Sequence, residues 1–318
     1  MTRLYALEAI RAAPWAIQPE WLAAIEAVAE RMMLSPDLEK LREADNSARY
    51  QGMMAALAGS GTRLEGAKTA TLSNGVAMIP VMGPIMPYAN MMADICGYTT
   101  LETLASDLRV ASGNSNVRQI LLVMDSPGGA TVQLSDAAGQ IASMDKPVTV
   151  FVTGTAASAA YWLASQADEI VMDSLALAGS IGIVCSTSTQ VGPDSNGRKG
   201  VDIVSSNAPN KRLDPSTDDG QAQIRSVLDD MEAIFMADVA RGRKTTVANV
   251  QQNFGQGGMK SAKSAVSAGM ADRIDTLSHT LARLGSMNSL KPSVKTASKR
   301  NSALAEDLEA RRKRSEGQ

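Results

Sequence analysis

Residues 117–164 read VRQILLVMDSPGGATVQLSDAAGQIASMDKPVTVFVTGTAASAAYWLA, and short apolar runs alternate in them with segments of helical periodicity. The first apolar run leads into a Ser-Pro-Gly-Gly turn, and the second leads into a series of small residues. Short buried strands that alternate with helices are typical of βαβ units and a parallel sheet. This stretch therefore predicts an α/β fold.

The same alternation continues on both sides of this stretch. GVAMIPVMGPI, residues 75–85, predicts a strand and a turn, and Thr100 is the expected N-cap of the helix that follows. Further strands are expected in IVMD (170–173), GSIGIVC (179–185), GVDIVSS (200–206) and GMADRID (269–275). Helices are expected at 217–243, 247–254 and 261–268.

Three regions follow from the composition along the chain. Residues 1–58 are expected to be helical, with apolar residues at helical spacing around Trp15 and Trp21, and Pro14 and Pro19 divide them into pieces. Residues 75–285 form the α/β domain. Residues 286–318 are polar, basic and then densely charged, which predicts a linker and a disordered tail.

Composition narrows the class of protein. The net charge of −2 excludes a bulk attraction to nucleic acid or to an anionic membrane. Cys96 and Cys185 form no disulfide framework, which suits a reducing compartment. No apolar run is long enough for a membrane anchor or a signal peptide, so we expect a soluble, cytoplasmic protein.

Four segments can carry chemistry, although each has a plain structural reading as well. The chain has a single histidine, His279, near the C-terminus, so a general base is either this histidine or a residue of another type. Glycines of the SPGG turn (126–129) leave backbone N–H groups uncovered, and Ser158 stands near a helix start among alanines. Ser180 lies in GSIGIV and Lys211 in a loop. A tight turn, a packed helix and a solvated lysine explain them equally well.

Taken together and in this order, SPGG, AASAAYW, GSIGIV and the loop lysine resemble the SppA-type (signal peptide peptidase A) serine peptidases, which share the Clp-protease/crotonase fold. The resemblance covers residues 75–274. It implies that Ser158 is the nucleophile, that Lys211 is the general base and that Ser180 holds the lysine. It places the oxyanion hole at the backbone N–H groups of Gly128 or Gly129 and of Ala159. It implies neither a metal nor a cofactor.

A Ser–Lys dyad suits a chain that is so poor in histidine. Lysine ordinarily stays protonated, and burial in an apolar site favours the neutral amine that can accept a proton. The small residues around Ser158 also favour a shallow cleft for a small side chain at the P1 position of a substrate.

Two departures from the SppA-type enzymes bear on the substrate. The chain has no membrane anchor, and its lysine loop reads NAPNKRLDPST (207–217). The PWAI segment, Pro14–Ile17, resembles the phage head-maturation (capsid) peptidases. That resemblance implies scaffold, capsid or portal proteins as substrates, and a homo-oligomer in which neighbouring subunits can complete a site.

Three alternatives remain on the sequence alone. The chain could be an assembly or scaffolding protein that keeps the peptidase fold with little activity, or a cytoplasmic protein-degrading enzyme related to signal peptide peptidases. An acyl-CoA enzyme of the crotonase branch shares the fold, but it would have no reason to keep Ser158, Ser180 and Lys211 as a set.

Overall fold

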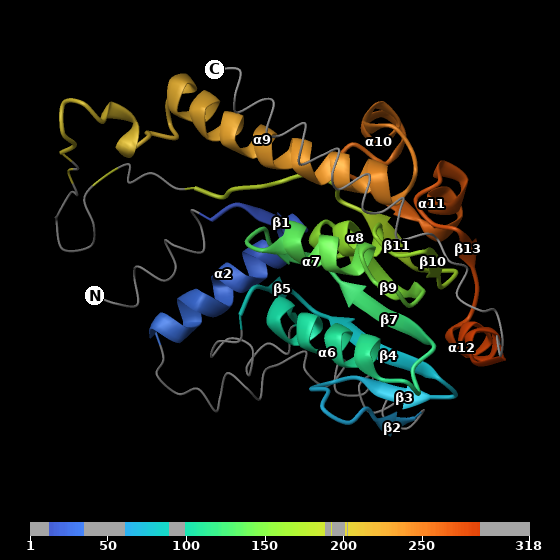
Figure 1. Cartoon of the computed structure of the whole chain (residues 1–318). Coiled ribbons are helices and arrows are strands. Elements are labelled where there is room, and N and C mark those ends of the chain that lie inside the picture. Colours follow the sequence, from blue (N-terminus) through green and yellow to red (C-terminus); the bar gives the residue numbers. More distant parts are fainter. Residues whose placement is uncertain are drawn as a thin grey trace, which may run out of the picture.

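The computed structural model of the chain describes residues 13–34, 61–88, 99–187, 192, 201 and 203–286 (Figure 1). The strands are β1 (Trp15–Ile17), β2 (Thr62–Arg63), β3 (Thr71–Ser73), β4 (Val76–Met82), β5 (Ile85–Met86), β6 (Thr99–Thr100), β7 (Gln119–Ser126), β8 (Gly128–Ala130), β9 (Val148–Ala157), β10 (Glu169–Met172), β11 (Leu177–Gly179), β12 (Met259–Ser261) and β13 (Arg273–Ile274). The helices are α2 (Pro19–Leu34), α6 (Leu101–Gly113), α7 (Leu134–Ala142), α8 (Ala159–Ala164), α9 (Asp218–Gly242), α10 (Val247–Asn253), α11 (Ala262–Ala268) and α12 (Leu277–Ser286), with a short 3₁₀ turn η1 at Pro209–Lys211.

The larger sheet has three long parallel strands at its centre, in the order β9-β7-β4. Strand β9 is long enough to pair in parallel with β10 along its first half and with β11 along its second half. Every residue of β4 and of β7 is buried. A parallel strand covered on both faces has no solvent side, which is why these strands read as continuous apolar runs. The predicted α/β fold is confirmed.

Alternate residues of β4 face two different apolar cores. Ala77, Ile79 and Val81 belong to the main core, which also contains buried residues of α6, α7 and α8. Val76 and Met78 face the other side, where a smaller core lies under α12 (Figure 1). Because side chains alternate along a strand, the sheet separates the two cores.

A second, smaller sheet has the order β1-β8-β5-β6. The chain passes from the large sheet to the small one at Pro127, between β7 and β8. The SPGG motif is therefore the joint between the two sheets, and its conformation fixes where the end of β7 lies relative to β1.

The predicted helix starts at Thr100 and Thr217 are confirmed. The Thr100 hydroxyl accepts a hydrogen bond from the Thr103 amide, and the Thr217 hydroxyl accepts one from the Gly220 amide. Each cap satisfies an amide that the first helical turn leaves without a partner.

Three expectations for local structure are wrong. Trp15 lies in a strand rather than a helix, because β8 offers its edge to the short segment between Pro14 and Pro19. The strand expected at 179–185 ends at Gly179, where a φ of 140° and then 53° at Ser180 break the ladder. Residues 203–206 form no strand. The division at residues 58, 75 and 285 stays a prediction, and residues 287–318 lie outside the described part of the chain.

No helix in the described ranges is both long enough and apolar enough to cross a membrane.

Candidate active site

Ser158 occupies the junction between β9 and α8 in an unusual backbone conformation. Its φ is 54° and its ψ is −115°, and its side chain is almost fully buried. The Ser158 amide donates to the carbonyl of Gly179 at 2.8 Å, and its carbonyl accepts from the Trp162 amide at 2.9 Å. A non-glycine residue with such dihedral angles costs about 1–3 kcal/mol and persists only where its surroundings impose it. Strain of this kind is concentrated at functional sites.

A β-bulge in the large sheet lies just before this junction and changes the direction of the end of β9. Met124 of β7 pairs with Val152 of β9, but Ser126 pairs with Ala156, so β9 carries two additional residues between these pairs. The carboxylate of Asp125 accepts a hydrogen bond from the Thr155 amide at 2.9 Å inside the bulge. Bulges bend a strand and redirect the residues after it. Here the bulge brings the end of β9 beside the SPGG turn.

The SPGG turn packs directly against Ser158. A Cβ added at Gly128, whose φ is 100°, would lie 3.0 Å from the Ser158 Cβ and would overlap the carbonyl oxygen of Ala16. A Cβ at Gly129 would overlap the backbone of Ile85. Both positions need glycine because other backbone segments occupy the space of a side chain. The structure therefore places Gly128 close to Ser158 and to Ala159, the residue after it.

Ser180 lies at the same edge of the sheet. Gly179 pairs with Ala157, the residue before Ser158, so Ser180 leaves β11 beside the β9–α8 junction. The Ser180 amide donates to the Gly258 carbonyl at 2.9 Å, and its φ is 53°. The hydroxyl of Ser158 donates to the carbonyl of Gly182 at 3.4 Å. Each serine therefore directly follows one member of the pair Ala157–Gly179 at this edge of the sheet.

Lys211 lies elsewhere in the single chain. It ends η1, its side chain is exposed, and its amide donates to the Ala208 carbonyl at 3.1 Å. In Figure 1 the yellow segment that leads into α9 projects from the end of that helix farthest from α10, well away from α8. One copy of the chain does not bring this segment to Ser158.

Helix α8 is braced by the C-terminal part of α9. The Trp162 ring stacks on Phe235 with 4.4 Å between ring centroids, and its Nε1 donates to the Asp238 carboxylate at 2.9 Å. The side chain of Gln166 donates to the Asp238 carbonyl at 3.0 Å. On the other side of α8 the Tyr161 hydroxyl donates to the Met270 carbonyl at 3.0 Å, and burial raises its pKa. These contacts fix the helix that carries Ser158.

The sequence did not point to Asp238 or to Ala16 as neighbours of the site. Asp238 is one of several acidic residues on α9 and differs from them only by being buried. Ala16 lies in the PWAI segment, whose two flanking prolines were a signal of a short separate element. Its strand pairing depends on residues more than a hundred positions away, which no local pattern encodes.

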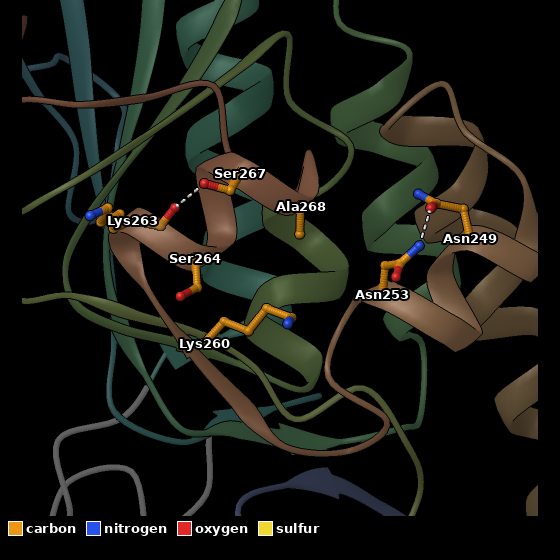
Figure 2. Close-up of a pocket in the computed structure, with 7 residues that line it drawn as sticks. All are labelled: Asn249, Asn253, Lys260, Lys263, Ser264, Ser267 and Ala268. Carbon is orange, nitrogen blue, oxygen red and sulfur yellow. Dashed lines mark hydrogen bonds between the residues drawn. The ribbon is translucent and has the colours of Figure 1, made fainter.

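A separate open hollow lies between α10 and α11 (Figure 2). Its lining is polar: Asn249, Asn253, Lys260, Lys263, Ser264, Ser267 and Ala268. None of the predicted catalytic residues lines it. His279 is exposed on α12, where its Nδ1 lies 2.8 Å from the Asp275 carboxylate. No cluster of metal-ligating side chains occurs among the residues the structure describes.

Comparison with known proteins finds two families whose sequence profiles match this chain. Residues 140–291 match the sequence profile of Peptidase family S49, and residues 92–176 match that of the Clp protease family. Ser158 lies inside both matches, and Ser180 and Lys211 lie inside the first.

Three curated relatives carry protease or phage-head names. Protease 4 of Haemophilus influenzae is 27% identical over 65% of this chain and 34% of its own length. The head-tail preconnector protein GP5 of Enterobacteria phage P21 is 34% identical over 41% of this chain and 26% of its own. The capsid assembly protease C of Escherichia phage lambda is 26% identical over 69% and 51%.

The matched part of this chain spans between about a quarter and a half of the length of these relatives. The predicted resemblance is confirmed: the chain is similar to Peptidase family S49 and to the Clp proteases, and its relatives include a capsid assembly protease and a head-tail preconnector protein of phages.

Proposed function

We propose that the chain is a serine endopeptidase in which Ser158 is the nucleophile and Lys211 the general base. The observation that carries the proposal is the strained, buried conformation of Ser158 between the SPGG turn and the first turn of α8. A packed structural serine needs no positive φ, whereas a nucleophile held beside backbone N–H donors benefits from a fixed geometry.

The proposed reaction assigns one step to each of these groups. The Ser158 oxygen attacks a peptide carbonyl, and its proton passes to the neutral amine of Lys211. The backbone N–H groups of Gly128 or Gly129 and of Ala159 donate to the oxyanion that forms. The protonated lysine gives its proton to the leaving amine. Water then attacks the acyl-enzyme while the neutral amine of Lys211 takes a proton from it. As the bond between the acyl carbon and the Ser158 oxygen breaks, the protonated lysine returns that proton to the Ser158 oxygen, which restores both residues.

The base comes from a neighbouring copy of the chain in this proposal. The segment that carries Lys211 is exposed, and apolar side chains lie uncovered along it and along α9: Ile203 is 92% exposed and Val227 is 54% exposed. Only Gly220 and residues of the last two turns of α9 are buried. Exposed apolar residues along one projecting arm are typical of a surface that packs on a partner. Ser180, beside Ser158, would then hold the incoming amine.

The proposed substrates are proteins of a phage head. Two of the relatives are named for head-tail connection and capsid assembly, and we carry that role over as scaffold, capsid or portal protein cleavage in the cytoplasm of a bacterial host. The proposed site uses no metal and no cofactor, and the net charge of −2 gives no reason to expect nucleic acid as a partner.

Co-expression with candidate capsid and scaffold proteins tests the proposal. We expect the wild-type chain to shorten at least one of them, as measured by intact mass, and Ser158→Ala and Lys211→Ala to leave all of them whole. His279→Ala is the matched control and should cleave like the wild type. Assembly of heads with no cleavage by any variant would favour the scaffolding alternative instead.

A further inference from the structure

The N-terminal strand β1 lies in a slot beside the nucleophile. On one side it pairs antiparallel with β8, with Ala16 opposite Gly129 and Ile17 opposite Gly128. On the other side the amide and carbonyl of Trp15 exchange two hydrogen bonds of 2.8 Å with Val184. The slot is therefore bounded by the SPGG turn and by the segment Gly182–Val184, whose first carbonyl accepts from Ser158.

The backbone of strand β1 lies close to Ser158. A Cβ added to Gly128 would overlap the Ala16 carbonyl oxygen and would lie 3.0 Å from the Ser158 Cβ. The side chain of Ser158 is 1% exposed in this arrangement. An attacking oxygen has to reach a substrate carbonyl at contact distance, and a serine so deeply buried offers a peptide no such approach.

Extended peptides commonly bind proteins as an added strand, through main-chain hydrogen bonds to an exposed edge. The slot offers such edges on both sides, and β1 satisfies them with its own backbone. We propose that β1 is a built-in competitor that takes the place of the substrate strand and must leave before Ser158 can act. This inference rests on the proposed function, since it assumes that Ser158 is the nucleophile.

The side chains of β1 indicate what the slot accepts. Ala16 faces inward and is fully buried in the main core, whereas Trp15 and Ile17 face outward into a separate apolar cluster with Leu22 and Ile25 of α2. The inward position has room for a small side chain only. A substrate would therefore be an extended segment with a small residue facing the core and large apolar residues on either side of it.

The same cluster acts as a latch for β1. Helix α2 covers Trp15 and Ile17, and the amide of Gln18 donates to the Pro127 carbonyl at 3.0 Å. Among the side chains that the structure describes, this cluster has four buried residues with a few partly buried ones against them, whereas the main core extends across the large sheet. The latch can open while the large sheet and α8 keep their packing.

A reversible covalent lock tests the inference in the full chain. Since the Trp15 amide and carbonyl are bonded to Val184, Trp15 and Ala130 face each other as a non-hydrogen-bonded antiparallel pair. Such pairs have Cα atoms about 4.5 Å apart, within the range a disulfide accepts. The variant is Trp15→Cys with Ala130→Cys, in a parent that carries Cys96→Ser and Cys185→Ser.

Two readouts compare its oxidised and reduced forms: hydrolysis of fluorescently labelled casein, and labelling of Ser158 by a fluorophosphonate, followed by intact mass. We expect the oxidised form to be at least tenfold slower in both, and the reduced form to exceed the parent because the Trp15 ring is gone. Equal rates in the two forms would overturn the inference and leave the proposed function standing. Absence of any Ser158-dependent hydrolysis or labelling, in the parent as well, would overturn both.

If the variant with the two cysteines does not fold, a single substitution tests the same inference. Ile17→Ser weakens the latch without touching the inward face of the slot, and it should raise both rates severalfold. Val132→Ser removes an exposed apolar side chain outside the cluster and is the matched control, with rates unchanged. A rate of Ile17→Ser equal to or below that of Val132→Ser would contradict the latch.

Discussion

The β9–α8 junction and the segment before α9 are built in opposite ways. At the junction, Ser158 is buried and both of its backbone groups are hydrogen-bonded, despite a positive φ. In the segment 203–217, Lys211 is exposed, and hydrogen bonds to nearby residues hold the turn around it. The first region is packed within a single chain, whereas the second leaves apolar side chains such as Ile203 exposed.

The proposed chemistry makes a different demand on each of these two regions. An oxyanion hole works because its donors are fixed before the reaction, which requires a rigid surrounding. A lysine base has to be neutral, and an exposed lysine is not in the apolar surrounding that favours the neutral amine. We infer that the folding of one chain fixes the geometry around Ser158, whereas the association of two copies gives Lys211 an apolar surrounding.

The largest effect should come from breaking the rigid region. Gly129→Ala places a methyl group on the backbone of Ile85, and we expect it to lower the free energy of unfolding by about 3 kcal/mol or more. Gly139→Ala in α7 is the matched change, since nothing lies within 4 Å of its added carbon. It should stabilise the chain by about 0.5–1 kcal/mol. Urea unfolding measures the free energy of unfolding of both variants. Equal free energies would contradict the close packing at the SPGG turn.

The brace between α8 and α9 should give the next largest effect. Asp238→Ala leaves the indole N–H of Trp162 buried without an acceptor, which should cost about 2–3 kcal/mol. Asp229→Ala removes an exposed carboxylate from the same helix and should change stability by less than about 0.5 kcal/mol. Thermal unfolding of the two variants compares them directly. Equal melting temperatures of the two variants would show that the contacts of Asp238 with α8 do not stabilise the fold.

A smaller effect concerns Asp272, which ties the strand β10 to the end of α9. Burial by itself raises the pKa of Asp272, but hydrogen bonds from Arg243 and from the Ile170 amide, with the Arg243 charge, lower the pKa overall. A lowered pKa stabilises the fold at a pH above the unfolded value of about 3.9, and this stability is lost as the pH falls through the folded value.

Asp272→Asn should therefore lower stability at pH 7 by about 1 kcal/mol, a value reduced by solvent screening of the partly exposed carboxylate. The difference between the two proteins should shrink below pH 4. A difference that stays constant down to pH 2 would show that the charge of Asp272 plays no part.

The smallest effect on stability is expected at Lys211. Lys211→Ala removes an exposed side chain and should change the free energy of unfolding by less than about 0.5 kcal/mol. In dilute protein kept monomeric, amide hydrogen exchange should also be fast at residues 203–213 and slow along β7 and β9. A large destabilisation by Lys211→Ala would mean that this segment is packed within its own chain, and it would remove the contrast between the two regions.

Local patterns in the sequence predicted most of the fold. Apolar runs indicated β4, β7 and β9, and threonine caps indicated the starts of α6 and α9, because burial and capping act on neighbouring residues. The same patterns failed at Ser180, where the residue turns through a positive φ, and at Trp15, whose strand depends on pairing with β8.

The candidate site was only partly visible in the sequence. The glycines of SPGG and the small residues around Ser158 indicated a close approach of backbones, and the structure brings Gly128, Ser158 and Ser180 together. The separation of Lys211 from them was not predictable, since it depends on the direction of α9 relative to the core. The assignment of these residues to catalytic roles stays a prediction.

Mixing two inactive variants tests the central claim most directly, namely that Ser158 and Lys211 of one site come from different copies. Ser158→Ala and Lys211→Ala are purified separately, combined in equal amounts under conditions that allow subunit exchange, and assayed for casein hydrolysis. A site shared between neighbours should recover about a quarter of the wild-type rate, because random mixing pairs an intact Ser158 with an intact Lys211 at about one interface in four. Mixtures that stay as inactive as their components, while the wild type is active and subunits exchange, would contradict the claim.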